Sequence, residues 1–179
     1  MAIAKRKKRF FNVEIPIINK TTQLRAYEQK ELIGRYLKYD LTRNLRGKAT
    51  ILTLKTVFEG ETVIASPVAI TLLPYYARRM VRRGTNYVED SFLTPTGETS
   101  VRIKPFLVTR RRVSRAVRKA LRNKAKEELV LWAKENDSQK MFEDILKGKI
   151  QKELSLKLKK IYPLSLCEIR ALKVEEKKE

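Results

Sequence analysis

Apolar and polar residues alternate in short runs through the first 108 positions, and this period of two predicts β-strands. The expected strands are 13–18, 31–39, 50–58, 62–73, 87–93 and 100–108. Pro16 marks the first as an edge strand, Gly34 predicts a bulge in the second, and Ser66-Pro67 interrupts the fourth. Residues 94–97 (Thr-Pro-Thr-Gly) predict a turn between the last two strands.

The period changes after position 108, where apolar residues recur every three or four positions and predict a long helix over 109–134. The stripe consists of Val113, Ala116, Val117, Ala120, Leu121, Ala125, Leu129 and Trp132. The remaining expected elements are a short helix at 75–83 beginning after Pro74, helices at 138–147 and 149–160, and a final strand at 164–174. This order of a β-rich part, a helical part and a closing strand indicates an α+β fold.

The chain of 179 residues is long enough for one domain with a real core. Residues 1–9 form a basic arm that is expected to be disordered in the free protein. Residues 10–179 are expected to form a single domain that is β-rich over 10–108 and helical over 109–161. The strand at 164–174 would close this domain.

Positive charge dominates the sequence, with 41 Lys and Arg against 20 Asp and Glu, a net charge of +21 and a pI of about 10.2. Eleven cations and no acid lie between Arg102 and Lys126. Along the expected helix, cations three and four residues apart form one ridge on the side away from the apolar stripe: Arg111, Arg115, Arg118, Arg122 and Lys126. A solvated face normally mixes charge signs, so this ridge indicates a polyanionic partner, for which nucleic acid is the usual candidate.

Two further groups of cations extend this candidate surface. Arg78, Arg79, Arg82 and Arg83 accompany the short helix, and the neighbouring Tyr75 and Tyr76 are expected to pack rather than to stack on bases. Arg110 to Arg112 lie at the expected N-terminus of the long helix, where positive charge opposes the helix dipole. Either a phosphate neutralises them there, or the three arginines belong to a solvated loop. The candidate binding residues are Lys5, Arg6, Lys7, Lys8, Arg9, Arg78, Arg79, Arg82, Arg83, Arg110, Arg111, Arg112, Arg115, Arg118, Lys119, Arg122 and Lys126.

Few residues in the chain could support catalysis. The sequence has no histidine and a single cysteine, Cys167, so no catalytic residue, metal site or cofactor is expected. Glu89-Asp90 is the one tempting carboxylate pair, and a loop or protein contact explains it better. Trp132 and Cys167 are expected in the core. No signal peptide and no apolar run of about 20 residues is evident, which favours a cytoplasmic protein that does not insert into membranes.

Long stretches of the chain resemble a known ribosomal protein family. The stretches are 87–92 (Tyr-Val-Glu-Asp-Ser-Phe), 101–122 with its arginine-rich centre, 32–37, 39–42, and 150–161 followed by Tyr162-Pro163-Leu164. Together they resemble the eukaryotic-type S-one, or S-three-A-E, family of the archaeal and eukaryotic small ribosomal subunit. The resemblance runs from about residue 10 to 174, and the chain is similar to an archaeal-like short form without the longer basic tails of eukaryotic members.

This resemblance implies a structural component of the small subunit, on the platform near the mRNA exit, and not an enzyme. Its partners would be rRNA, neighbouring ribosomal proteins and mRNA near the exit, with no independent homo-oligomer. It also implies a β-barrel-like core with helices packed around it. Three alternatives stay open from the residues alone: a free regulatory nucleic-acid-binding protein, an enzyme that acts on nucleic acid, and a membrane-binding amphipathic helix.

Overall fold

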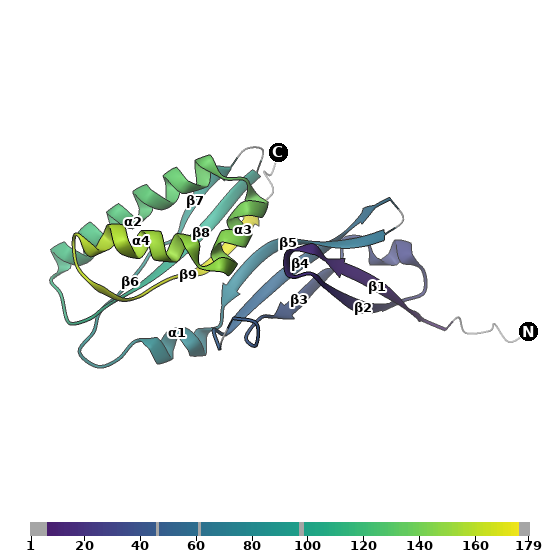
Figure 1. Ribbon diagram of the computed structural model, residues 1–179, viewed down its shortest axis with the longest axis horizontal. Coiled ribbons are helices and arrows are strands. Elements are labelled where there is room, and N and C mark those ends of the chain that lie inside the picture. The colour runs from purple at the N-terminus through teal and green to yellow at the C-terminus, as the bar shows by residue number, and fades with distance from the viewer. Residues whose placement is uncertain (1–6, 46, 61, 97–98, 176–179) are drawn as a thin grey trace, which may run out of the picture. The chain divides into compact units, whose positions relative to one another are not determined.

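The computed structural model describes residues 7–45, 47–60, 62–96 and 99–175 (Figure 1). Within these ranges, nine strands form one mixed sheet that is accompanied by four α-helices and two short 3-10 helices. The expected α+β class and the closing strand are confirmed. The sheet does not close into a barrel, so the expected barrel-like core is wrong in that respect. Its path runs in the order β2 (Lys20–Ala26), β1 (Arg9–Ile15), β5 (Thr62–Leu72), β9 (Leu164–Glu175), β8 (Thr99–Thr109) and β6 (Tyr87–Glu89). Among the described residues, the strands at the two ends of this path do not pair with each other.

The chain divides into two compact units. Unit 1 comprises Met1–Tyr39 and Leu52–Val68, and unit 2 comprises Asp40–Ile51 and Ala69–Glu179. Strands β4 (Thr50–Glu59) and β5 (Thr62–Leu72) contribute residues to both units. The sequence predicts both strands, and the alternating pattern of β4 places Leu52 and Leu54 in the core.

Unit 1 contains a hairpin that the sequence pattern only partly predicts. β1 (Arg9–Ile15) pairs antiparallel with β2 (Lys20–Ala26), and β1 also runs parallel to β5 at Val13. The first strand ends at residue 15 because Pro16–Ile18 forms a 3-10 helix, where proline sits without donating an N–H. β2 was not expected, since its sequence is polar and only Ala26 is buried.

The expected strand over 31–39 is wrong in its first half. Gln29–Leu32 forms a 3-10 helix, and only β3 (Tyr36–Asp40) is a strand, paired with β4. Gly34 lies between them with a φ of 74°, a conformation that glycine adopts without steric cost. The backbone N–H of Gly34 donates to the carbonyl of Thr56 at 2.9 Å, so this residue forms a turn beside β4 and not a strand bulge.

Pro67 does not interrupt β5, contrary to the sequence expectation. β5 is continuous over 11 residues, pairing with β1 at residues 63–64 and with β9 at residues 69–71. Pro67 lies between these two paired stretches. Its missing N–H therefore removes no hydrogen bond from the pairing with β1 or from the pairing with β9.

Unit 2 has a sheet centred on β8 (Thr99–Thr109), which pairs with β9 (Leu164–Glu175) on one side. On its other side β8 pairs with β6 (Tyr87–Glu89) and β7 (Phe92–Thr96). The single strand expected at 87–93 is therefore two strands. Residues 94–96, expected in a turn, belong to β7, and Gly97 lies outside the described residues.

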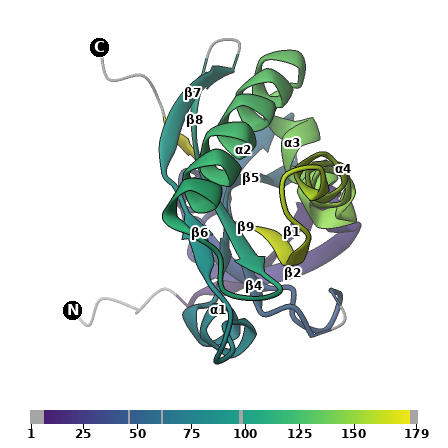
Figure 2. The ribbon, with the colours of Figure 1, turned by 90° about the vertical axis from the view of Figure 1, so that its left-hand side faces the viewer.

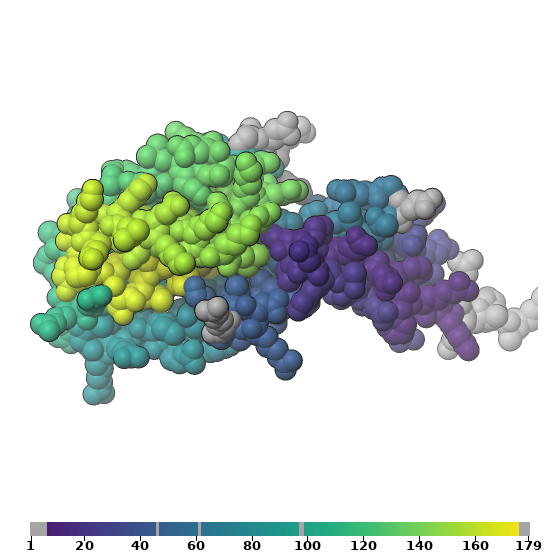
Figure 3. Space-filling view, viewed as in Figure 1, coloured from purple at the N-terminus to yellow at the C-terminus, as the bar shows by residue number. Residues whose placement is uncertain are grey.

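Four helices belong to unit 2, and three of them follow β8 in sequence: α2 (Arg115–Glu135), α3 (Ser138–Lys147) and α4 (Lys149–Lys159). α2 packs against β6 and β7, whereas α3 and α4 pack against β9 (Figure 2). The space-filling view shows the outer surface of α3 and α4 in yellow-green (Figure 3). α1 (Pro74–Met80) begins with its proline in the first helical turn, as expected, but ends three residues earlier than the predicted 83.

The long helix begins at residue 115 and not at 109. Ser114 is its N-cap, and the Ser114 hydroxyl accepts a hydrogen bond from the Val117 N–H. Thr109 still belongs to β8. The buried residues of the helix are Leu121, Ala125, Leu129, Trp132 and Ala133, so the predicted stripe is confirmed only in its second half. Ala116 and Ala120 are exposed.

Gly148 joins α3 to α4 and is the C-cap of one and the N-cap of the other, with a φ of 72°. An L-residue pays about 1–2 kcal/mol in this left-handed conformation. We expect Gly148→Ala to lower the free energy of unfolding by about 1 kcal/mol, whereas Gly148→Asn should cost less. Thermal denaturation of the two variants checks this, and an unchanged midpoint for Gly148→Ala would contradict it. No other heavy atom comes within 4 Å of an added Cβ, so the cost is conformational and not steric.

Candidate nucleic-acid interface

The arginines near α1 divide between the helix and the segment after it. Arg78 and Arg79 are exposed on α1, while Arg82 and Arg83 follow its end and are also exposed. The Arg79 guanidinium lies 5.4 Å from the ring centroid of Tyr76, which is buried against the core. Packing of Tyr76 is confirmed, but Tyr75 is 53% exposed and contradicts the packing expected for it.

Arg110, Arg111 and Arg112 lie in the loop between β8 and α2, and all three are exposed. Arg111 is therefore not part of the helical ridge, and the three arginines do not oppose the helix dipole from within its first turn. Asn86 holds this loop: its side-chain oxygen accepts from the Val113 N–H at 2.9 Å. The backbone N–H of Thr109 donates to the Asn86 carbonyl, and the Asn86 N–H donates to the Thr109 hydroxyl.

The rest of the ridge lies on α2, and it is not opposite to the buried stripe: Arg118 lies in line with the stripe, and the other cations lie beside it. Arg115, Arg122 and Lys126 are exposed, whereas Arg118 is half-buried. Lys119 is exposed beside them. The ammonium of Lys126 lies 5.8 Å from the ring centroid of Phe92 in β7. A helix places residues three and four apart on one surface, so these cations form a continuous positive edge of α2.

A hollow between α2 and β6 gathers several of these cations. We call it the Arg118 hollow; it has a volume of about 410 Å³ and is lined by Tyr87, Val88, Arg115, Arg118, Lys119, Arg122 and Asn123. A second hollow of about 530 Å³ lies on α1 and includes Arg78, Phe106 and Arg170. Tyr87 lines both hollows, so one side chain on strand β6 connects Arg78 to the cations of α2.

Asn86 and Tyr87 were not anticipated as site residues. Asn86 precedes the three-residue strand β6, and Tyr87 begins it. Their roles depend on the pairing of β6 with β8, which brings them beside α2. The sequence contains no local signal that would separate Tyr87 from the other tyrosines.

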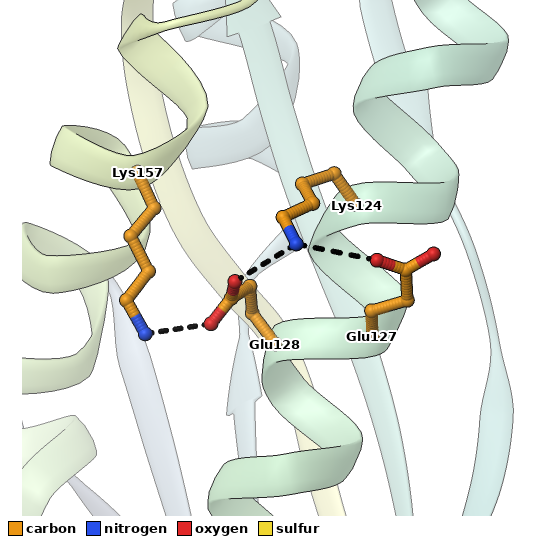
Figure 4. Close-up of polar contacts among 4 residues, drawn as sticks. All are labelled: Lys124, Glu127, Glu128 and Lys157. Atoms are coloured by element: carbon orange, nitrogen blue, oxygen red, sulfur yellow. Dashed lines mark hydrogen bonds and ion pairs between the residues drawn. The ribbon is translucent and has the colours of Figure 1, made fainter.

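Charge pairing begins in the second half of α2, where acids appear. Glu128 accepts from Lys124 of the same helix at 3.2 Å and from Lys157 of α4 at 2.6 Å, and Glu127 also pairs with Lys124 (Figure 4). The hydrogen bond from Lys157 is the main cause that holds the pKa of Glu128 below its ordinary value, and Lys124 adds to it. This network fastens α2 to α4. Within the described part of the chain, no comparable acid pairs with Arg115, Arg118, Lys119 or Arg122.

The N-terminal cations belong to unit 1. Lys5 and Arg6 lie outside the described residues, whereas Lys7, Lys8 and Arg9 are described and exposed. Arg9 opens β1 opposite Ala26, and the ammonium of Lys8 lies 5.2 Å from the ring centroid of Tyr27. These three residues thus add positive charge around the start of the first strand.

Several residues considered for other chemistry have structural roles. Arg170 donates to a Glu89 carboxylate oxygen at 2.9 Å, and Asp90 accepts from the Ser91 N–H, so the pair is engaged within the protein. Cys167 is buried, and burial raises the pKa of its thiol to about 12, which suppresses the reactive thiolate. Among the described residues, no group of three or more acids and cysteines is placed to hold a metal ion. None of the described helices has the length and apolar character needed to cross a bilayer.

Comparison with known proteins gives one consistent result. The model of the Ribosomal S3Ae family matches residues 4–178. The chain is 28% identical over 182 residues to the small ribosomal subunit protein eS1 of Nanoarchaeum equitans, covering 95% of this chain and 90% of that protein. It is 32% identical over 158 residues to eS1 of Pyrobaculum aerophilum, covering 83% and 70%. For eS1 of Methanothermobacter thermautotrophicus the identity is 30% over 140 residues, covering 75% and 72%.

Proposed function

The chain belongs to the Ribosomal S3Ae family in its archaeal type, and from this premise we propose that it is a structural component of the small ribosomal subunit that binds rRNA. Its role is in translation, in the cytoplasm, and it is architectural and not enzymatic. We further propose that it occupies the platform near the mRNA exit, with ribosomal proteins as neighbours and mRNA within reach, and that residues 10–179 act as one rRNA-binding domain.

The observation that carries rRNA binding is the positive edge of α2. Four cations of this edge have no acidic partner among the described residues: Arg115, Arg118, Lys119 and Arg122. The acids of the same helix, Glu127 and Glu128, pair with Lys124 instead. Such a row repels itself in the free protein and is stabilised when phosphates approach it. The guanidinium group donates to two phosphate oxygens at once, which suits the fixed phosphate positions of folded rRNA.

The remaining cations extend this surface. Arg78, Arg79, Arg82 and Arg83 near α1 and Arg110 to Arg112 in the loop are exposed in the same unit as α2. Their contacts would be mainly to phosphate and sugar, which position a protein on RNA without reading its sequence. Lys7, Lys8 and Arg9, together with Lys5 and Arg6, would provide contacts from unit 1.

Sedimentation of cell extract through a sucrose gradient tests the proposal. The protein should be recovered with the small subunit in near-stoichiometric amount at low salt and should stay there at moderate salt, because several phosphate contacts act together. Mass spectrometry of the gradient fractions provides the measurement. A protein that stays at the top of the gradient in both salts would instead be a free nucleic-acid-binding protein, and the proposal would be wrong.

A further inference from the structure

Arg118 occupies a position where the helix pattern calls for an apolar residue. It precedes Leu121 by one turn and Ala125 by two turns, and Leu129 and Trp132 continue the same line. Those four residues are buried, with exposures between 0% and 9%. In a helix of 3.6 residues per turn, Arg118 therefore continues the buried stripe and does not point away from it.

The guanidinium of Arg118 is incompletely satisfied within the described protein. Its Nε is out of contact with solvent and has no hydrogen-bond partner there, and no ion pair to Arg118 is formed among the described residues. A buried donor without an acceptor is costly, more so when the group is charged. An anion in the Arg118 hollow would offset the charge of this half-buried guanidinium.

The Arg118 hollow attracts such an anion. Arg115, Lys119 and Arg122 line it together with Arg118, and no acid is among its lining residues. Its volume of about 410 Å³ falls within the range of about 300–1,000 Å³ that is usual for small-ligand sites. The space therefore suits a group the size of a single nucleotide.

Tyr87 supplies an aromatic surface at the same place. It is 53% exposed, and its ring lies 6.3 Å from that of Phe106, centroid to centroid, which supports it from behind. Pairing with Val108 of β8 fixes the backbone of Tyr87 on the rigid sheet. A half-exposed, supported tyrosine beside cations is the arrangement on which an unpaired base stacks.

We propose that the Arg118 hollow binds one unpaired nucleotide of rRNA, with its phosphate on Arg118 and its base stacked on Tyr87. The inference rests on the proposed rRNA binding and specifies one of its contacts. The terminal nitrogens of Arg118 donate to phosphate oxygens, while Arg115 and Arg122 neutralise the remaining charge. The site distinguishes single-stranded from paired RNA, because a base within a duplex has no free face for Tyr87.

Ultraviolet cross-linking of purified small subunits, followed by mass spectrometry, tests this contact. We expect Tyr87 in the wild-type protein to cross-link to one nucleotide that is unpaired in the rRNA. Tyr87→Phe keeps the aromatic face and should retain the cross-link, whereas Tyr87→Leu should lose it. Tyr75→Leu is the matched control, since Tyr75 is equally exposed and lies outside the hollow; it should leave the Tyr87 cross-link unchanged.

Arg118→Met separates the role of this arginine in binding from its role in folding. It replaces the unpaired guanidinium with an apolar side chain on the buried stripe, so the melting temperature of the free protein should stay equal or rise. The cross-link from Tyr87 should fall about tenfold or more, the loss expected when one charged hydrogen bond is removed. A lower melting temperature together with an unchanged cross-link would mean that Arg118 serves the fold alone.

The two proposals fail in different ways. If the wild-type protein is absent from small subunits, rRNA binding itself is wrong. If the protein is present but Tyr87 cross-links to a neighbouring protein, to a base-paired nucleotide or to nothing, the nucleotide site is wrong while rRNA binding stands.

Discussion

Reversing Arg115, Arg118 and Arg122 to glutamate is expected to prevent stable incorporation of the protein into small subunits while leaving the isolated protein folded. Hydrogen bonds to charged groups contribute about 1.5–3 kcal/mol each, so losing three lowers the affinity about a thousand-fold or more. The introduced negative charges repel phosphate in addition. The fold should tolerate the change, because none of the three side chains forms an ion pair within the described residues and Arg115 and Arg122 are exposed. At Arg115, in the first helical turn, an acid is also favourable for the helix dipole.

The measurement is the fraction of the variant that sediments with small subunits, with circular dichroism of the free protein as the check on folding. A matched control reverses three exposed lysines of unit 2 that also lack acidic partners among the described residues, Lys140, Lys159 and Lys160. The control changes the net charge equally, so a loss confined to the arginine variant assigns binding to α2. Normal incorporation of the arginine variant would show that the positive edge of α2 is not an rRNA contact.

The sequence pattern predicts the α+β class and most elements of unit 2, because these elements bury one face. The second half of α2 is an example: Leu121, Ala125, Leu129 and Trp132 recur at helical spacing and are all buried. The start of α2 could not be predicted this way. Thr109 is held in β8 through Asn86, and the Ser114 cap then begins the helix, so local capping and a tertiary contact override the extended apolar pattern.

The errors in unit 1 have a related cause. β2 buries almost nothing and forms because it pairs with β1 along all seven residues, a tertiary contact that leaves no hydrophobic signature. Leu32 and Ile33 extend the pattern that predicts a strand over 31–39, yet Gly34 with positive φ turns the chain there. The spacing of apolar and polar residues indicates which side chains are buried. It does not indicate which strands pair or where the backbone turns.

For the candidate site, the sequence identifies the cations but not their grouping. A run of eleven cations without an acid is visible in the sequence, since charge is a property of residue type alone. That Arg118 lies on the buried side of α2, and that Tyr87 joins the hollows on α1 and α2, follows only from the packing of α2 on β6. The binding role proposed for Tyr87 depends on its position beside α2, and only the fold determines that position.

The core beneath α2 is expected to be far more sensitive to substitution than the cationic surface. Leu129 is 0% exposed, and Leu129→Ala should lower the free energy of unfolding by about 2–5 kcal/mol, since it leaves a cavity between α2 and the sheet. Leu131→Ala is the matched control on the same helix, where the leucine is 55% exposed and the loss should stay below about 1 kcal/mol.

Trp132 is the only tryptophan and is buried on α2, so its fluorescence during urea denaturation reports unfolding of unit 2. A lower midpoint for Leu129→Ala with an unchanged midpoint for Leu131→Ala would place the stabilising face of the helix at 121–132, as described. Equal losses in both variants would mean that α2 is buried on both faces.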